Sequence, residues 1–235
     1  MQWDAHTHLL PGIDDGARNW EESLAMARLA VQDGTQLMYL TPHYVPGLYE
    51  NTADQIRALT EEFRQRLQAA GIPLRIEPGC EIFLHPELPR RVADGIVMTY
   101  GDQGRHLLIE LPPHEIPWGT EDCFFELQLQ GLVPVLAHPE RNEAIQDDPA
   151  WVVEMSERGV LMQVTSGAIL GSFGKRAQRT ARYLARQGCI DLIGSDAHGF
   201  QVRRPLISEA LRLLARWGGS ELAAQVRKNP LQSVG

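Results

Sequence analysis

Residues 2–8, Gln-Trp-Asp-Ala-His-Thr-His, contain a short run that leads directly into two histidines separated by one residue. We predict a strand over Gln2–Ala5 that delivers His6 and His8 at its end. In extended backbone, side chains two residues apart point to the same side, so both imidazoles can reach one cation. The start of the chain therefore predicts a strand that ends in a pair of metal ligands.

Six further short apolar runs predict strands, and several are bounded by glycine or proline. They cover Gln36–Leu40, Leu74–Glu77, Leu107–Leu111, Val133–Ala137, Leu161–Val164 and Ile190–Gly194. Between the runs, amphipathic patterns predict helices: one capped by Asn19 and ended by Gly34, one over Ile56–Leu67, and others at Glu121–Gln130, Pro149–Arg158 (with Pro149 as first helical residue), Lys175–Arg186 and Pro205–Trp217. This alternation is typical of βα units, which build a parallel sheet with helices outside. Periodicity leaves open whether the sheet closes into a barrel.

Length and composition narrow the class of protein. The 235 residues fit a single α/β barrel domain, and no run approaches the length of a membrane span. The net charge of −8 and the absence of a basic cluster weigh against nucleic-acid binding. Three cysteines without a C-x-x-C pair indicate neither a disulfide framework nor a thiolate zinc site. We expect a cytoplasmic protein that does not insert into membranes, because polar residues at once follow the first methionine.

Ionisable residues follow six of the seven predicted strands, where a parallel barrel builds its active site. They are His6, His8 and Asp14 after the first strand, then His43, Glu81, Glu110, His138, Asp196 and His198. One such residue would mean little, since a lone histidine is more often a hydrogen-bonded polar residue than a ligand. The set predicts a metal site. Imidazole and carboxylate ligands suit Mn, Fe, Zn, Co or Mg, and their number exceeds one tetrahedral ion, which indicates two or three ions.

Other catalytic machineries do not fit the sequence. None of the three cysteines is followed, after five residues, by the arginine that a cysteine-dependent phosphatase requires. There is no phosphate-binding loop of the G-x-x-x-x-G-K-[ST] type and no G-x-S-x-G nucleophile elbow. An amidohydrolase would also begin with H-x-H, but neither Lys175 nor Lys228 lies at a predicted strand end, where such enzymes use a carbamylated lysine.

Seven motifs together resemble the PHP (polymerase and histidinol phosphatase) superfamily, and within it the bacterial metal-dependent tyrosine phosphatases of capsule and exopolysaccharide operons. They are His6-x-His8, Pro11–Gly16, Thr41-Pro42-His43, Gly79–Ile82, Leu108–Pro112, His138–Arg141 and Ser195–His198. The resemblance spans nearly the whole chain. It implies a distorted (β/α)7 TIM-like barrel, one PHP-type domain over residues 1–235, and three divalent ions, most often manganese.

The resemblance also implies a role for each matching residue. The first ion would be held by His6, His8, Glu81 and Asp196. Glu81 would bridge to a second ion, completed by Glu110 and His138. A third ion would be held by Asp14, His43 and His198. Arg141 and Arg203 match the arginines that bind substrate phosphate in the family.

The expected reaction is hydrolysis of phosphotyrosine by a metal-bridging hydroxide, with a phenolate as leaving group. By resemblance, the substrate would be a tyrosine kinase that regulates polysaccharide synthesis and export. Two alternatives stay open: a small-molecule phosphatase of the same superfamily, such as histidinol-phosphate phosphatase, and a non-catalytic metal-binding regulatory module. The sequence leaves open whether the chain forms a homo-oligomer.

Overall fold

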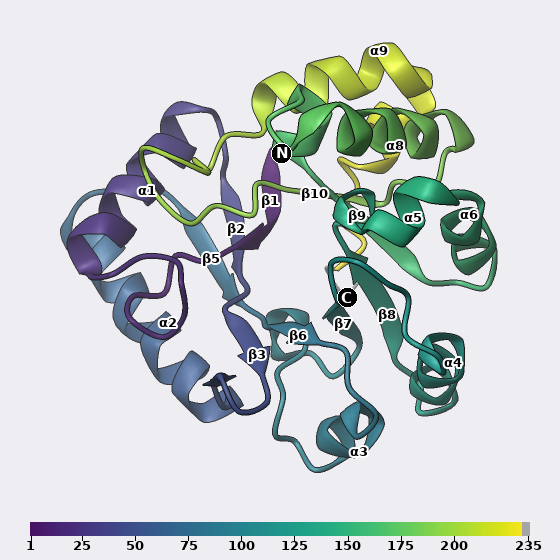
Figure 1. Ribbon diagram of the computed structural model, residues 1–235. Coiled ribbons are helices and arrows are strands. Elements are labelled where there is room, and N and C mark those ends of the chain that lie inside the picture. Colours follow the sequence, from purple (N-terminus) through teal and green to yellow (C-terminus); the bar gives the residue numbers. More distant parts are fainter. Residues whose placement is uncertain (232–235) are drawn as a thin grey trace.

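Parallel strands form the centre of the computed structural model, which describes residues 1–231, and helices surround them (Figure 1). The strands are β1 (Trp3–Thr7), β2 (Leu37–Leu40), β3 (His43–Val45), β4 (Tyr49–Glu50), β5 (Arg75–Pro78), β6 (Glu81–Phe83), β7 (His106–Glu110), β8 (Val133–Ala137), β9 (Leu161–Thr165) and β10 (Leu192–Gly194). The helices are α1 (Trp20–Gln32), α2 (Ala53–Ala69), α3 (Leu88–Ala93), α4 (Thr120–Leu129), α5 (Glu143–Asp147), α6 (Ala150–Glu157), α7 (Ser166–Leu170), α8 (Gly174–Gln187) and α9 (Ser208–Gln225). Two 3₁₀ turns lie at Tyr100–Asp102 and Pro139–Arg141.

The strands form a distorted barrel. One sheet has the order β1-β2-β5 and the other β10-β9-β8-β7-β6-β3-β4, and every pair except β3–β4 is parallel. Because β3 continues β2 after Thr41-Pro42, and β6 continues β5 after Gly79-Cys80, the two sheets join along these interrupted strands. A parallel bridge between Thr7 and Ala197 connects β1 to the chain after β10 and closes the circle.

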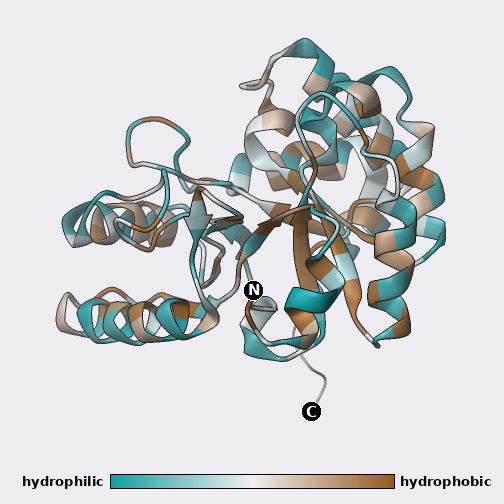
Figure 2. Cartoon of the chain, turned by 60° about the horizontal axis from the view of Figure 1, so that its bottom comes forward, coloured by the Kyte–Doolittle hydropathy of each residue, from teal (hydrophilic) through white to brown (hydrophobic). Residues whose placement is uncertain are grey.

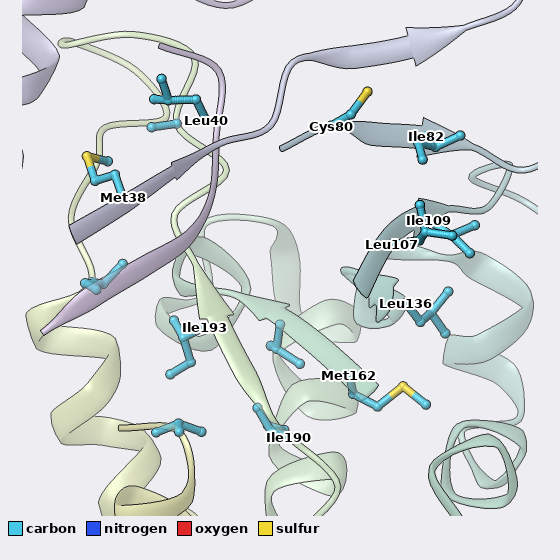
Figure 3. Close-up of a cluster of buried hydrophobic side chains, with 14 of the residues drawn as sticks. Met38, Leu40, Cys80, Ile82, Leu107, Ile109, Leu136, Met162, Ile190 and Ile193 are labelled. Carbon is cyan, nitrogen blue, oxygen red and sulfur yellow. The ribbon is translucent and has the colours of Figure 1, made fainter. Parts of the chain in front are cut away.

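The strand sequences are nearly continuous hydrophobic runs because an apolar layer covers each of their two faces. One layer lies between the strands and the helices and includes Met38, Ile109, Leu136 and Met162 (Figure 3). The other includes Trp3 and residues from β2, β7, β8 and β10 on the opposite face of these strands, inside the barrel. In Figure 2 the strands are mostly hydrophobic, whereas the helices carry hydrophilic residues on their outer surfaces.

All seven predicted strands are present, and β8 has the predicted bounds. The Asn19 cap is also confirmed, since its side chain accepts a hydrogen bond from the Glu22 amide at the start of α1. Pro149 differs from prediction: it caps α6, which begins at Ala150. The short helices α3, α5 and α7 were not predicted, because five or six residues are too few to show a helical period.

The last part of the chain, for which the sequence indicates no role, completes the core. Helix α9 continues beyond the predicted end at Trp217, through a kink at Gly219, where φ is 78°. The segment that follows brings Leu231 into the cluster inside the barrel and Asn229 to the Tyr39 hydroxyl. Among the helices within residues 1–231, none is long and apolar enough to cross a membrane.

Candidate metal centre

The predicted ligands gather at the carboxyl ends of the barrel strands. His6, His8, Glu81 and Asp196 lie closest together and are at most 1% exposed. Closure of the barrel brings these residues together. The amide of Asp196 donates to the His6 carbonyl over 2.8 Å, which connects the residues after β10 to β1. The register of β1 against β2 also shifts between Asp4 and Thr7, at the segment that carries His6.

The atoms of this first group surround one point. His6 Nε2 lies 3.1 Å from His8 Nε2 and 3.1 Å from Glu81 Oε2. Asp196 Oδ1 lies 3.5 Å from His6 Nε2 and 3.3 Å from His8 Nε2. Ligands bound at about 2.1 Å to one ion are separated by roughly 3.0–3.4 Å, so these separations fit a shared cation. The predicted first group is therefore brought together by the fold.

Hydrogen bonds at the other ring nitrogens fix which nitrogen of each histidine faces the centre. His6 Nδ1 donates to Gln163 Oε1 over 2.9 Å, and His8 Nδ1 donates to Asp14 Oδ2 over 2.7 Å. The Nε2 atom of each ring is then left with its lone pair directed at the centre. Burial would raise the pKa of Asp14, but its hydrogen bonds with His8 and with the amides of Gly16 and His43 lower it below its usual value.

Glu81 connects the first group to a second. Its Oε1 lies 2.7 Å from His138 Nε2, while its Oε2 lies 3.0 Å from His43 Nδ1. Glu110 Oε1 lies 3.7 Å from the same His138 nitrogen, and its Oε2 lies 3.9 Å from His43. Burial, followed by the neighbouring charge of Glu81, raises the pKa of Glu110 to about 9. Two carboxylates this close require a cation between them if both are to be ionised.

In a third group Asp15, next to the predicted Asp14, lies near two predicted ligands, His43 and His198. Asp15 Oδ1 lies 3.2 Å from His198 Nε2 and 3.5 Å from His43 Nε2. Hydrogen bonding to His198 lowers the pKa of Asp15. Asp14 Oδ2 accepts instead from His8 Nδ1 and from the His43 amide, so both its neighbours hold it behind the His8 ring. Asp15 is therefore a candidate beside Asp14 for the carboxylate of the third group, and Asp14 as a ligand stays a prediction.

Several buried polar atoms in these groups lack a partner within residues 1–231. They include Glu81 Oε2, His43 Nδ1 and His198 Nε2, each of which lies within 3.2 Å of another atom of the groups without completing a well-aligned hydrogen bond. A buried acceptor without a partner is costly, and a carboxylate even more so. These nitrogen and oxygen atoms therefore fit as ligands of divalent cations. Imidazole and carboxylate ligands suit the class of ions that the sequence predicts.

Arg141 and Arg203 meet at the edge of the first group. Each donates to Asp196 Oδ2 over 2.5 Å. Arg141 also stacks over the Phe173 ring, 4.5 Å from its centroid. Both guanidiniums retain some exposure, at 27% and 30% of their side chains, so each remains accessible to an anion at the mouth of the site.

Two residues of the site were missed from the sequence. Gln163 occupies the middle of β9 among apolar neighbours, and only the register of β9 against β8 shows that it faces the centre. Asp15 is adjacent to Asp14, and the conformation of their loop turns Asp15 toward His43 and His198 and the more buried Asp14 toward His8. The other histidines lie apart, as expected: His85, His106 and His114 belong to none of the three groups.

A closed parallel barrel with histidines and carboxylates at the carboxyl ends of its strands is the architecture of a metal-dependent barrel enzyme. The chain belongs to the family described as "Capsular polysaccharide synthesis, CpsB/CapC", whose model matches residues 2–234. It is 36% identical over 226 residues to tyrosine-protein phosphatase YwqE of Bacillus subtilis, covering 96% of this chain and 89% of that protein. It is 25% identical over 228 residues to tyrosine-protein phosphatase CpsB of Streptococcus pneumoniae, covering 95% and 93% of the two chains.

Solved structures agree with this membership. One solved structure superposes on this chain with a TM-score of 0.93 at 36% identity, covering 97% of this chain and 92% of that one. It is described under crystal structures of YwqE from Bacillus subtilis and CpsB from Streptococcus pneumoniae, "unique metal-dependent tyrosine phosphatases". Histidinol phosphate phosphatase of Lactococcus lactis superposes with a TM-score of 0.60 at 12% identity, covering 93% and 94%, which shows the shared fold alone. The predicted family and barrel are confirmed.

Proposed function

We propose that this chain is a metal-dependent protein tyrosine phosphatase in which residues 1–235 form one PHP-type domain. The observation that carries the proposal is the convergence of three His- and carboxylate-containing groups on one another, next to two partly exposed arginines. The names of the similar proteins, tyrosine-protein phosphatases, support the same activity. Retention of the ligand set argues against a non-catalytic regulatory module.

Three divalent ions, with manganese as the first candidate, would be held by this chain. His6, His8, Glu81 and Asp196 would hold the first, and Glu81, Glu110 and His138 the second. His43, His198 and Asp15 would hold the third. When bound, such ions lower the pKa of water toward neutrality and withdraw charge from phosphoryl oxygens.

The chain's own residues would orient the substrate. Arg141 and Arg203 present guanidinium donors that suit the oxygens of a phosphoryl group. Phe173 holds the Arg141 guanidinium from one side. A tyrosine phosphoester has a phenolate leaving group, and the pKa of about 10 of the corresponding phenol reduces the need for a proton donor. The substrate we propose is a phosphotyrosine-bearing protein, namely a bacterial tyrosine kinase of capsular or exopolysaccharide synthesis, and the location we propose is the cytoplasm.

The test is hydrolysis of a phosphotyrosine peptide by manganese-loaded protein, with and without a chelator. We expect turnover that the chelator abolishes and that added manganese restores. Histidinol phosphate serves as the comparison substrate, and we expect a much lower kcat/KM for it. Turnover of histidinol phosphate but not of the peptide, with bound metal verified, would overturn the proposal in favour of a small-molecule phosphatase.

A further inference from the structure

A pocket opens beside the metal centre, where the chain leaves β9 and β10. Its volume of about 430 Å³ lies in the range of small-ligand sites. Arg203, which donates to Asp196, forms part of its wall. Phe173, which lies under the Arg141 guanidinium, forms another part. The pocket therefore adjoins the side of the centre where the two arginines lie.

The wall of this pocket has a charge opposite to that of the whole protein. Arg203 and Arg204 line it together with three serines, and none of its lining residues is acidic. The chain as a whole has a net charge of −8. Leu170 and Leu206 add apolar surface to the same wall. Guanidinium and hydroxyl donors beside apolar walls suit an anionic group carried on an apolar stem or ring.

Polar atoms in the wall are available for a ligand. Arg203 Nε lies in the wall, is buried and makes no hydrogen bond within residues 1–231. The Ser195 hydroxyl is also buried and faces the Asp4 carboxylate, so it can donate to that carboxylate or to a ligand. Buried donors without an acceptor cost free energy, and an anion in the pocket would supply the acceptor.

The aromatic part of the pocket wall is fixed before a ligand binds. A Cβ atom at Gly167 would lie 2.7 Å from Phe173 Cε2, so only glycine lets the ring pack this closely against the backbone at the start of α7. The ring contacts both the backbone of Gly167 and the guanidinium of Arg141. A fixed aromatic wall reduces the ordering that a ligand must impose on binding.

We propose that this pocket binds a second anionic side chain of the substrate, a carboxylate or a phosphate next to the reacting phosphotyrosine. The inference rests on the proposed function, because the phosphotyrosine itself would occupy the metal centre. Arg203 and Arg204 would meet the anion, and Leu170, Phe173 and Leu206 would contact its stem or ring. The pocket thus selects phosphotyrosines that lie in an acidic or multiply phosphorylated stretch.

The experiment compares kcat/KM for three peptides that share one phosphotyrosine and differ in its neighbours. One peptide carries flanking glutamines, one flanking glutamates, and one a second phosphotyrosine. We expect the wild-type chain to prefer the anionic peptides over the neutral one by about tenfold. If only the doubly phosphorylated peptide is preferred, the pocket takes a phosphate; if both are preferred, it takes either anion.

Two variants and two matched controls assign the preference to the pocket. Arg204→Gln removes a positive charge from the wall and Ser172→Asp adds a negative one, so both should reduce the preference to less than about twofold. Ser172→Asn changes the size without the charge. Arg212→Gln removes an exposed arginine of α9 that does not line the pocket. Both controls should keep the wild-type preference.

Equal kcat/KM for all three peptides in the wild-type chain overturns the proposal, as does an unchanged preference in Arg204→Gln and Ser172→Asp. Failure of the proposed function has a different signature, in which no peptide is hydrolysed. Binding of fluorescently labelled peptides in the presence of a chelator then gives the answer without turnover. Tighter binding of an anionic peptide that Arg204→Gln abolishes supports the pocket, and equal binding of all three overturns it.

Discussion

Arg141 and Arg203 donate to the same atom, Oδ2 of Asp196, each over 2.5 Å. The other oxygen of that carboxylate faces His6 and His8 at 3.5 and 3.3 Å. Asp196 (φ 52°) and Arg203 (φ 47°) both lie in the left-handed region that costs non-glycine residues energy. This strained backbone places the Asp196 carboxylate between the candidate metal ligands on one side and the two candidate phosphate-binding arginines on the other.

This shared carboxylate gives the first prediction. Asp196→Asn keeps the size of the side chain but removes the charge that His6, His8 and both arginines face. We expect kcat/KM on a phosphotyrosine peptide to fall by about 1,000-fold or more, because metal binding and arginine orientation are lost together. Bound metal, measured by elemental analysis after gel filtration, should fall as well.

The matched control is Asp191→Asn, just before β10, where the Asp191 carboxylate accepts from the Met162 amide, away from the centre. It should retain at least about a third of the wild-type kcat/KM, since the amide oxygen can still accept from Met162 and only the bond from Gln225 Nε2 is lost, away from the centre. Equal losses in the two variants would mean that Asp196 serves the stability of the barrel rather than its chemistry.

Asp14 and Asp15 are adjacent, and the second prediction separates them. Asp15→Asn removes a proposed ligand, so the protein should bind about one ion fewer at saturating manganese. Asp14→Asn leaves the ligand set intact and weakens the acceptor behind His8 Nδ1, so the full number of ions should bind with roughly 10–100-fold lower affinity. Calorimetric titration with manganese measures both quantities. The reverse pattern would restore Asp14 as the ligand, as the sequence predicted.

How far the sequence predicts this site follows from how local each feature is. His6 and His8 belong to one strand, where the period of two places them on the same side without any tertiary contact. Glu110 was also predictable, because a carboxylate inside an apolar run has few explanations besides a cation. The choice between Asp14 and Asp15 was not, since it depends on how the loop after β1 packs against the His43 amide.

The closure of the barrel and the role of Gln163 could not be predicted from the sequence, for a related reason. Closure rests on the bridge between Thr7 and Ala197, which are nearly the whole chain apart. The hydrogen bond between Gln163 and His6 can form only because that closure places β9 opposite His6. Periodicity predicts elements and their ends, whereas contacts between distant elements require the three-dimensional arrangement.

Gln163 gives the third prediction. Its Oε1 accepts from His6 Nδ1 and, over 3.3 Å, from the His138 amide, so it positions two candidate ligands of different ions. Gln163→Leu removes the acceptor and frees the His6 ring to change tautomer. We expect manganese affinity to fall by roughly 10–100-fold. Gln163→Glu keeps an acceptor at the same position and should retain affinity within about tenfold. Similar losses in both variants would contradict a positioning role and indicate a packing defect.

The fourth prediction concerns pH and lies away from the metal centre. His106, at the start of β7, is buried, and burial followed by the charge of Arg105 lowers its pKa from 6.5 to about 4. Between these values the unfolded chain binds a proton at this residue and the folded chain does not, so stability falls as the pH drops from 6.5 toward 4. At pH 5 the loss should be on the order of 1–2 kcal/mol.

His106→Phe cannot titrate and should lose correspondingly less stability between pH 7.5 and pH 5. Denaturant unfolding at both pH values measures the difference, and titration of the metal centre cancels because both chains share it. His114→Phe is the control, since His114 is exposed on the surface beside Glu143. Its pH dependence should match that of the wild-type chain. If the two variants behave alike, the burial of His106 does not control acid stability.

The last prediction follows from the number of buried carboxylates and imidazoles at the strand ends. Glu81 and Asp196 are fully buried, and Glu110 carries a pKa of about 9 as long as no cation offsets their charges. A cation that binds only the folded chain stabilises it by about 2.7 kcal/mol at 100 times its dissociation constant. In a chain of this length that corresponds to a rise of roughly 5–10 °C in Tm. We therefore expect a chelator to lower Tm by at least this amount and added manganese to restore it in proportion to the logarithm of its concentration. His6→Gln should show a smaller response, because one ligand of the first group is lost, whereas His114→Gln should respond as the wild-type chain does. A Tm that is the same with chelator and with manganese would contradict a metal centre at the ends of these strands.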